Sequence, residues 1–440
     1  MPGLSLAVFD HGKIVKAQGY GVASRASGNP VTPETLFQAG SVSKPVSAVG
    51  ILQRVEAGQL TLDTDINQYL KSWKLPSNAL TKATNVTVRQ LLSHSAGTTV
   101  HGFAGYETGA PLPTVVDVLN GAGPANNRPI VVDLEPGLLW RYSGGGYVVL
   151  LEAFVDVTGR PFPDYMTEHV LKPWGMTEST FEQPLPSDRR ASAATGHDVT
   201  GRPVAGGSHV YPELTAAGLW TTPSDLARFA LGLEAAYAGR SSVLSQATAR
   251  AMLTVQIGQW GLGIALRGTG HTRKFWHNGR NDGFDTFLVG SVEMGQGAAI
   301  MINRNDNSPA MMHVLDAIAA AYGWADFQAY RPPEPIRDAN PALTSELSGI
   351  LVAMGKGEFE PSLFSPALCD MLSKKLKDGS SFRTEYAGNG AFRSLEALHS
   401  TDRGSTIRYF YRAHFENLNV LLELSIQEDG KIGALTLNPE

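Results

Sequence analysis

Cysteine is almost absent from this sequence, since Cys369 is the only one among 440 residues. A single thiol cannot form an internal disulfide, and it excludes a multi-cysteine zinc site and a thiol–disulfide redox pair. No apolar run approaches the ~18 residues that a membrane span needs. Neither a run of basic residues nor a His-Glu-x-x-His motif is present. The sequence therefore argues against a membrane-spanning protein, a nucleic-acid-binding protein and a zincin metallopeptidase.

What remains is the composition of an ordinary globular protein, with 42% hydrophobic residues, 18% charged residues and a net charge of −5. Its length suggests one large domain with a smaller one, or two to three domains. The N-terminal Met1-Pro2-Gly3 runs directly into a strand-like segment, without the pattern of a signal peptide. We expect a cytoplasmic protein as the sequence stands, or a periplasmic or secreted one if an upstream segment has been trimmed.

Strand-like segments lie at both ends of the first 327 residues. Between them the sequence indicates helices and loops, including a long Gly-, Pro- and Asn-rich stretch from Thr98 to Pro136. The fold class that this order favours is α/β (α+β): an antiparallel sheet flanked by helices, with an inserted helical subdomain and a cleft at the junction. The expected strands are residues 4–9, 13–17, 274–279, 284–290 and 298–303.

A Pro-rich linker is expected at residues 328–342, and the pattern changes after it. Residues 343–440 show two helical stripes, followed by alternating apolar residues typical of antiparallel strands. This order predicts a small α+β domain that loosely resembles the nuclear-transport-factor-like fold. It contains no catalytic set, so we expect a packing, dimerisation or cleft-covering role.

The stretch that carries chemistry is Gln38 to Pro45, which predicts a serine at the start of a helix. Ser41 and Lys44 are three residues apart and share one helix face. A serine hydroxyl becomes a nucleophile when a neighbouring base takes its proton, and a lysine kept partly neutral can be that base. By itself the pattern is weak, because a chain of this length contains roughly one Ser-x-x-Lys by chance.

Other segments of the sequence support the interpretation of Ser41 and Lys44 as a catalytic pair. The chain resembles the class C-like branch of the serine β-lactamase and penicillin-binding-protein superfamily over about residues 1–325. That branch also contains DD-peptidases, D-amino-acid amidases and esterases. The segments that carry the resemblance, in chain order, are Ser41-x-x-Lys44, Leu91 to Gly97, Pro136-Gly137, Tyr142-Ser143, Pro173 to Met176, Ala217 to Trp220, His277-Asn278-Gly279 and Gly283-Phe284.

The resemblance implies a role for each matching residue. Ser41 would form the acyl-enzyme, and Lys44 would hydrogen-bond Ser41 and help to deprotonate its hydroxyl. The oxygen of Tyr142 would relay the proton to and from Ser41 and the leaving group. His277 stands where the third motif usually has lysine. The N–H groups of Ser41 and Arg280 would form the oxyanion hole. The residues implied in substrate binding are Ser143, Gly144, Asn278 and Gly279.

Two positions depart from the family pattern. Gly144 stands where the family often has an asparagine that holds the amide of a β-lactam or a peptide, and this difference favours ester cleavage. His277 replaces the lysine, as it does in some D-aminopeptidase-like members, which keeps peptide substrates open. A histidine titrates near neutral pH, so we expect activity to fall on the acidic side as His277 becomes charged. His94 ends a short helix and is interpreted as a structural cap rather than a catalytic group.

The function that the sequence favours is a serine hydrolase acting on a small ester or amide through an acyl-serine. The alternatives are a β-lactamase, D-amino-acid peptidase or amidase, and a non-catalytic penicillin-binding-like protein. The chain has no Gly-x-Ser-x-Gly, so an α/β-hydrolase nucleophile elbow is unsupported. We expect no cofactor, no metal, a small-molecule substrate, no nucleic-acid partner and possible homo-oligomers.

Overall fold

The computed structural model describes residues 2–305, 308–324, 327, 334–358, 360–377, 390–402 and 406–439. The chain forms two compact units, which we describe one at a time. The first unit comprises Met1–Pro76, Asn85–Val131 and Ser143–Ala329. The second comprises Ser77–Thr84, Val132–Tyr142 and Tyr330–Glu440.

The first unit contains a six-stranded antiparallel sheet in the order β2-β1-β8-β7-β6-β5. Strands from both ends of the unit therefore meet in one sheet, as the sequence predicts. His11 and Gly12 both have positive φ, which suits the tight turn between the first two strands. The strands are β1 Gly3–Asp10, β2 Lys13–Gly21, β5 Ala265–Arg267, β6 Lys274–Asn281, β7 Phe284–Ser291 and β8 Gly297–Ile302.

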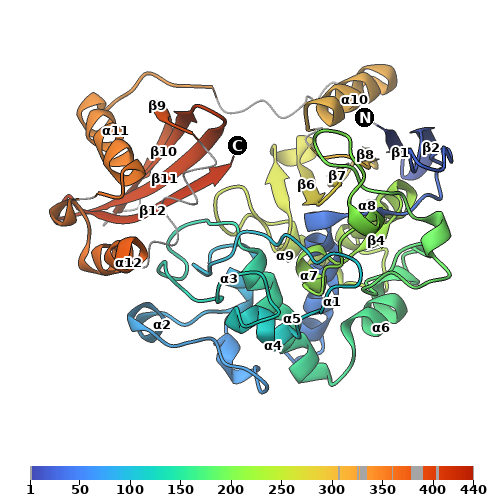
Figure 1. The fold of residues 1–440 in the computed structure, drawn as a ribbon, viewed down its shortest axis with the longest axis horizontal. Coiled ribbons are helices and arrows are strands. Elements are labelled where there is room, and N and C mark those ends of the chain that lie inside the picture. Colours follow the sequence, from blue (N-terminus) through green and yellow to red (C-terminus); the bar gives the residue numbers. More distant parts are fainter. Residues whose placement is uncertain are drawn as a thin grey trace. The chain divides into compact units, whose positions relative to one another are not determined.

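Helices cover both faces of this sheet, which is why β1 is buried at every position. On one face, α10 (Ser308–Tyr322) packs Met311 and Leu315 against side chains of β1, β7 and β8. Helix α8 (Pro223–Tyr237) contacts the same three strands, and in Figure 1 it lies on their other side. The cap of α8 is the predicted one, since Thr222 Oγ1 accepts a hydrogen bond from the Asp225 N–H.

Most of the remaining helices follow β2 in the chain and precede β5, as the predicted helical insertion. One of them, α4, lies inside the stretch that the sequence presents as a long loop, where Thr114 and Asp117 cap each other. A two-stranded sheet joins β3 (Phe37–Gln38) to β4 (Trp220–Thr221). The helices of the first unit are α1 Ser43–Glu56, α3 Val88–Leu92, α4 Val115–Asn120, α5 Gly144–Thr158, α6 Phe162–Met166, α7 Leu214–Ala217 and α9 Gln246–Met252. Helix α2, Ala79–Ala83, belongs to the second unit.

The second unit contains two long helices against a four-stranded antiparallel sheet in the order β12-β11-β10-β9. Tyr411, Ala413 and Phe415 alternate along β10 and pack with apolar side chains of the helices. The two helices and the antiparallel strands confirm the predicted α+β character, although β9 was not predicted. The elements are α11 Pro341–Gly355, α12 Pro366–Lys377, β9 Phe392–Asp402, β10 Thr406–Phe415, β11 Asn419–Gln427 and β12 Ile432–Pro439.

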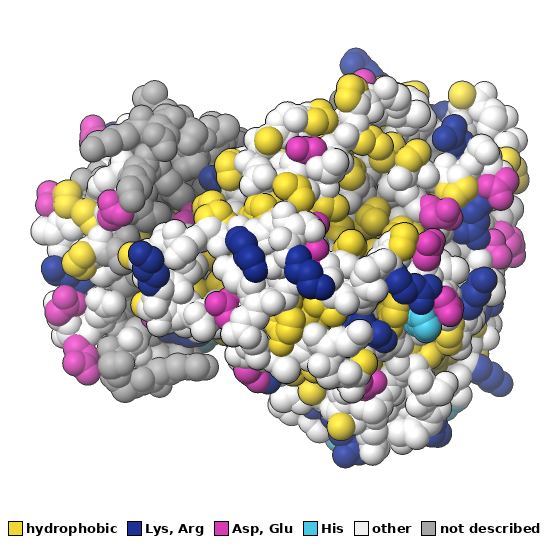
Figure 2. All heavy atoms as spheres, turned by 90° about the horizontal axis from the view of Figure 1, so that it is seen from below, with side chains coloured by type: hydrophobic (Ala, Val, Ile, Leu, Met, Phe, Trp, Pro, Cys, Tyr) yellow, Lys and Arg dark blue, Asp and Glu magenta, His cyan; other side chains and the backbone are white. Residues whose placement is uncertain are grey.

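The domain boundaries at 327 and 343 remain predictions, and residues 328–333 of the expected linker lie outside the described residues. The nuclear-transport-factor-like character of the C-terminal part also remains a prediction. Within the described ranges, no helix is both long enough and apolar enough to cross a bilayer. On the face drawn in Figure 2, acidic and basic side chains are interspersed among uncharged ones, in keeping with a net charge of −5.

Candidate active site

Ser41 lies on a single 3₁₀ turn, Gly40–Val42, immediately before α1. Its side chain is half-buried, while Lys44 on the first turn of α1 is only 2% exposed. Lys44 Nζ lies 3.0 Å from Ser41 Oγ and donates a hydrogen bond to the Ala216 carbonyl at 2.9 Å. The predicted pair is therefore within hydrogen-bonding distance, and the Ala216 carbonyl holds the amine beside the hydroxyl.

Burial decides the protonation of this lysine. It lowers the pKa of Lys44 from 10.5 to about 7, because the ammonium form loses its hydration. The Nζ also lies 5.6 Å from the centre of the Tyr147 ring. Near neutral pH a substantial fraction of Lys44 is therefore a free amine, which is the form that can accept a proton from Ser41.

The turn that carries Ser41 is tied to the segment after α7. Ser43 Oγ donates to the Gly40 carbonyl at 2.6 Å and accepts from the Leu219 N–H at 3.0 Å. The Ala39 N–H donates to the Leu219 carbonyl. Because Ala216 and Leu219 lie three residues apart, one short segment fixes both the nucleophile's turn and the Lys44 amine.

The two predicted oxyanion donors lie on backbone segments in close contact. Gly40 has φ +52°, and a Cβ at this position would come 2.5 Å from the Arg280 nitrogen. A Cβ on Gly279 would come 3.0 Å from the Ser41 nitrogen. Only glycine at residues 40 and 279 allows the end of β6 to approach the Ser41 turn this closely. The Arg280 side chain is turned to Asp285, with bonds of 2.7 and 3.1 Å.

His277 is fully buried on β6, and its Nδ1 lies 2.5 Å from the Asn278 carbonyl. Since a carbonyl only accepts, Nδ1 carries the proton. Burial, followed by the charge of Lys44, lowers the pKa of His277 to about 3. This finding is at odds with the expectation that His277 titrates in the working range: in this environment it is neutral throughout, and Lys44 titrates near pH 7 instead. The neighbouring Asn278 is exposed.

Tyr142 is grouped with the second unit and Ser143 with the first. The Tyr142 side chain is half-buried and packs against Trp140, with ring centres 6.4 Å apart. Ser143 is buried, caps α5 by accepting from the Gly146 N–H at 3.0 Å, and donates to the Thr99 carbonyl at 2.8 Å. The Ser143 hydroxyl thus has structural partners, and the roles of Tyr142 and Ser143 towards a substrate remain predictions.

The space beside Gly144 is occupied. A Cβ at residue 144 would lie 3.0 Å from the His101 carbonyl oxygen and 3.0 Å from the Phe103 ring. The Gly144 N–H donates to that same carbonyl at 2.9 Å, so the loop is bonded in place. An asparagine of the kind that the family often has here would require Phe103 to move.

Two features of the site were not predicted from the sequence. One is the Ala216 carbonyl, which no sequence pattern marks because any residue supplies such an oxygen. The other is His94, whose ring packs against Trp260 at 5.0 Å, while Trp260 packs edge-on against His277 at 5.4 Å between ring centres. The sequence does show a His-x-x-Gly motif, His94 to Gly97, directly after the helix that ends at Leu92. This motif indicated only a helix cap.

Comparison with known proteins shows what this chain resembles. A family model described as Beta-lactamase matches residues 1–323. "Penicillin-binding protein 4" of Amycolatopsis lactamdurans is 27% identical over 323 residues, which cover 69% of this chain and 81% of that protein. Further relatives are matched over only 39% to 42% of their own length, so the activity of a whole relative is not transferred to this chain.

Solved structures share the fold. The structure described as "Crystal structure of SurE with D-Leu" aligns with TM-score 0.65 at 22% identity, covering 99% of this chain and 93% of that one. A D-amino acid amidase from Ochrobactrum anthropi SV3 aligns with TM-score 0.56 at 22% identity, covering 73% of this chain and 94% of that one. These comparisons confirm the predicted α/β fold class with its antiparallel sheet and inserted helices.

Proposed function

This chain belongs to the beta-lactamase family of serine hydrolases, and we propose that it cleaves a small ester or amide through an acyl-serine intermediate on Ser41. The observation that carries the proposal is the buried Lys44 amine, 3.0 Å from Ser41 Oγ, with its pKa lowered to about 7. A fully charged lysine could not accept the serine proton, whereas this one can at neutral pH.

Acylation begins when the Ser41 oxygen attacks the substrate carbonyl carbon and its proton passes to Lys44 Nζ. The carbonyl oxygen becomes an oxyanion, which the N–H groups of Ser41 and Arg280 would stabilise from the two segments that Gly40 and Gly279 bring together. Collapse of the tetrahedral intermediate breaks the bond to the leaving alcohol or amine. In the proposed assignment Tyr142 relays this proton from Lys44 Nζ to the leaving group, which returns the amine to its neutral form.

Deacylation repeats these steps with water as the nucleophile. Water gives up a proton to the same base, attacks the acyl carbon, and releases the acid as Ser41 regains its proton. His277 remains neutral, because its pKa is about 3. The neutral imidazole of His277 adds no charge beside Lys44. A lysine at residue 277 would add a positive charge and would lower the pKa of Lys44 further.

Between esters and amides, the surroundings of Gly144 favour esters. The family's asparagine contact with an amide is missing, and the His101 carbonyl and Phe103 ring fill the space at the Gly144 Cα. A D-amino-acid amide or peptide remains the second candidate, because a D-amino acid amidase and a SurE structure with D-Leu share this fold. A β-lactamase activity and a non-catalytic penicillin-binding-like protein are further alternatives.

The decisive experiment is the search for an adduct on Ser41. The wild-type chain and the Ser41→Ala variant are incubated with a fluorophosphonate and with a penicillin, and the modified peptide is located by mass spectrometry. We expect a stable fluorophosphonate adduct on Ser41 in the wild type and none in S41A. Parallel assays with a p-nitrophenyl ester, a chromogenic cephalosporin and a D-Ala-D-Ala peptide rank the substrates, with the ester expected to be the best.

The two classes of alternative give different results. A penicillin adduct that forms without turnover of any of the three substrates would support the non-catalytic protein. Absence of every adduct on a folded wild-type chain would contradict the acyl-serine proposal.

A further inference from the structure

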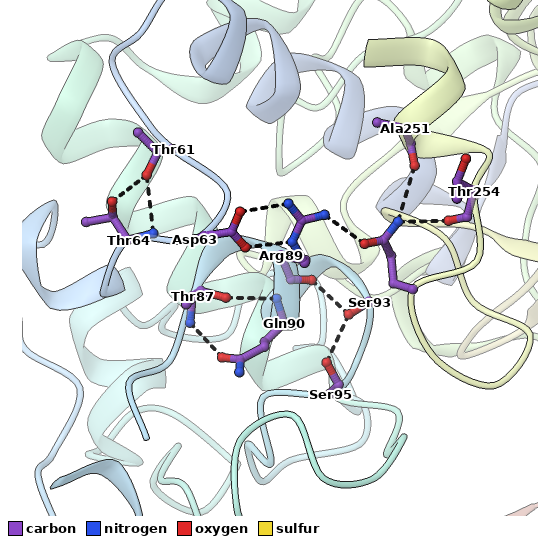
Figure 3. A network of polar contacts seen from close by, with 11 residues as sticks. Thr61, Asp63, Thr64, Thr87, Arg89, Gln90, Ser93, Ser95, Ala251 and Thr254 are labelled. Carbon is purple, nitrogen blue, oxygen red and sulfur yellow. Dashed lines mark hydrogen bonds and ion pairs between the residues drawn. The ribbon is translucent and has the colours of Figure 1, made fainter. Parts of the chain in front are cut away.

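His94 follows Ser93 at the C-terminal end of α3, a short helix of the first unit that several side-chain contacts hold in place. Figure 3 shows contacts that hold this helix, among them the pair of Arg89 with Asp63 at 2.6 Å. Arg89 also donates a hydrogen bond to the side-chain oxygen of Gln256 at 2.8 Å. Thr87 and Gln90 cap its start, and Ser93 Oγ donates to the Arg89 carbonyl. His94 itself has φ +58°, a left-handed conformation that a histidine adopts at some cost.

The His94 ring is hydrogen-bonded to the backbone of a distant segment. Its Nδ1 accepts a hydrogen bond from the Ser143 N–H at 3.1 Å, across 49 residues of sequence. The residue is 2% exposed, and its ring lies 5.3 Å from the Tyr147 ring and 5.0 Å from that of Trp260. Because Nδ1 accepts, the neutral ring carries its proton on Nε2.

The surroundings keep this ring neutral. Burial is the largest cause that lowers the pKa of His94 well below 6.5, followed by the positive charge of Lys44. A protonated ring would have no acceptor for the Ser143 N–H. The neutral ring, which the lowered pKa favours, is therefore the form that keeps the contact with Ser143 near neutral pH.

The amide that His94 holds belongs to the peptide bond between Tyr142 and Ser143. That bond is also where the chain passes from one compact unit to the other. Ser143 is bonded on its other side as the cap of α5 and to the Thr99 carbonyl. The N–H and the hydroxyl of Ser143 are thus both bonded, and the N–H is part of the peptide bond that joins Ser143 to Tyr142.

We propose that His94 is a positioning residue, whose Nδ1 fixes the Tyr142–Ser143 peptide and thereby holds the Tyr142 phenol in its working orientation. This proposal rests on the proposed function, because it gives the phenol a task in proton transfer. A small displacement of such a group is costly, since a shift of about 1 Å can lower a rate about 100-fold. His94 would act through Tyr142 without touching the substrate.

The test compares two substitutions of His94. In His94→Asn the side-chain oxygen can occupy nearly the place of Nδ1, and asparagine tolerates the left-handed conformation. In His94→Phe the ring remains but the acceptor is lost. With a p-nitrophenyl ester, we expect H94F to lower kcat at least about 10-fold with little change in KM, and H94N to restore most of the loss. Equal kcat values for H94F and the wild type would overturn the proposal, as would an equal loss in both variants.

A double-mutant cycle separates positioning from general support of the fold. In a Tyr142→Phe background, the H94F substitution should lower the residual kcat by less than about 2-fold, because the group that His94 positions is already missing. A loss as large as in the wild-type background would show that His94 does not act through Tyr142. Should H94F fail to reach the wild-type circular dichroism spectrum, His94→Gln replaces it, since its acceptor lies one methylene too far away.

Failure of the function and failure of the positioning role are distinguishable. If the fluorophosphonate does not label Ser41 in the wild type, the proposed function fails and the positioning role fails with it. If Ser41 is labelled at the same rate in wild type, H94N and H94F, only the positioning role fails.

Discussion

The Cα of Gly40 lies so close to the backbone of Arg280 that a Cβ on residue 40 would come within 2.5 Å of the Arg280 nitrogen. Gly40 precedes the nucleophile, and Arg280 carries one of the two proposed oxyanion donors. The distance between these two backbones therefore sets the width of the proposed oxyanion hole.

The substitution Gly40→Ala should strongly lower activity. The new methyl group would push β6 away from the Ser41 turn, and the positive φ adds a cost of ~1 kcal/mol by itself. The control is Gly58→Ala, since Gly58 has φ +70° but nothing within 4 Å of a Cβ. We expect G58A to show the conformational cost alone, with full esterase activity, while G40A loses at least about 100-fold in kcat/KM. Similar activity in the two variants would contradict the proposed hole.

The acid limb of the rate profile should belong to Lys44. Its amine must be neutral to accept the Ser41 proton, and its pKa is lowered to about 7. Below that pH the ammonium form predominates, so kcat/KM should fall about 10-fold for each further pH unit. His277, with a pKa of about 3, contributes nothing to this limb.

A His277→Asn variant checks this assignment. We expect a lower rate but an acid limb within about half a pH unit of the wild-type position, because a neutral group has been replaced by a neutral one. A profile that becomes flat between pH 5 and 8 in H277N would assign the limb to the histidine instead.

The local parts of this site could be predicted from the sequence. The spacing of Ser41 and Lys44 and the Thr222 cap of α8 depend on residues within one helical turn, and the structure confirms them. The contact between Lys44 and Ala216 joins residues 172 apart in the chain, and no periodicity encodes it. The same holds for the bond from Ser143 to His94.

Among the elements that were missed, β9 and α4 were missed for a different reason. Strand β9 reads Phe-Arg-Ser-Leu-Glu-Ala-Leu-His, which alternates poorly because charged residues interrupt it. It forms because β10 supplies the partner strand. Helix α4 has only six residues and follows a Gly- and Pro-rich stretch, so its capping residues were the only local signal.

Replacement of Gly144 by asparagine should lower the stability of the fold without changing substrate specificity. Gly144→Asn places a side chain against the Phe103 ring and the His101 carbonyl, and overpacking of this kind costs about 1 to 3 kcal/mol. We expect a lower unfolding temperature and no gain in cephalosporin turnover. The control is Gly102→Asn, because nothing lies within 4 Å of a Cβ on Gly102.

A second substitution should relieve the strain. In the double variant Gly144→Asn with Phe103→Ala, the removed ring leaves space for the asparagine, and the unfolding temperature should rise above that of G144N. Any gain in amide or cephalosporin turnover should appear only in this double variant. An unchanged unfolding temperature in G144N would show that Phe103 yields freely and does not close this subsite.

Glu213, the residue before α7, is fully buried, and burial raises the pKa of its carboxyl to about 7. Between pH 4.5 and 7 the folded chain keeps this proton while the unfolded chain has released it, so stability falls as pH rises through that window. Glu213→Gln is a neutral replacement of the same shape and removes the dependence. A shift from 4.5 to about 7 corresponds to roughly 3 kcal/mol above pH 7.

Thermal unfolding at two pH values measures this effect. E213Q should unfold at a higher temperature than the wild type at pH 8 and at nearly the same temperature at pH 4, because only the ionised carboxylate is penalised by burial. Glu107→Gln serves as the control, since Glu107 is exposed and should change neither value. A stabilisation of E213Q that is equal at the two pH values would mean that packing, rather than the charge of the carboxylate, limits stability at this position.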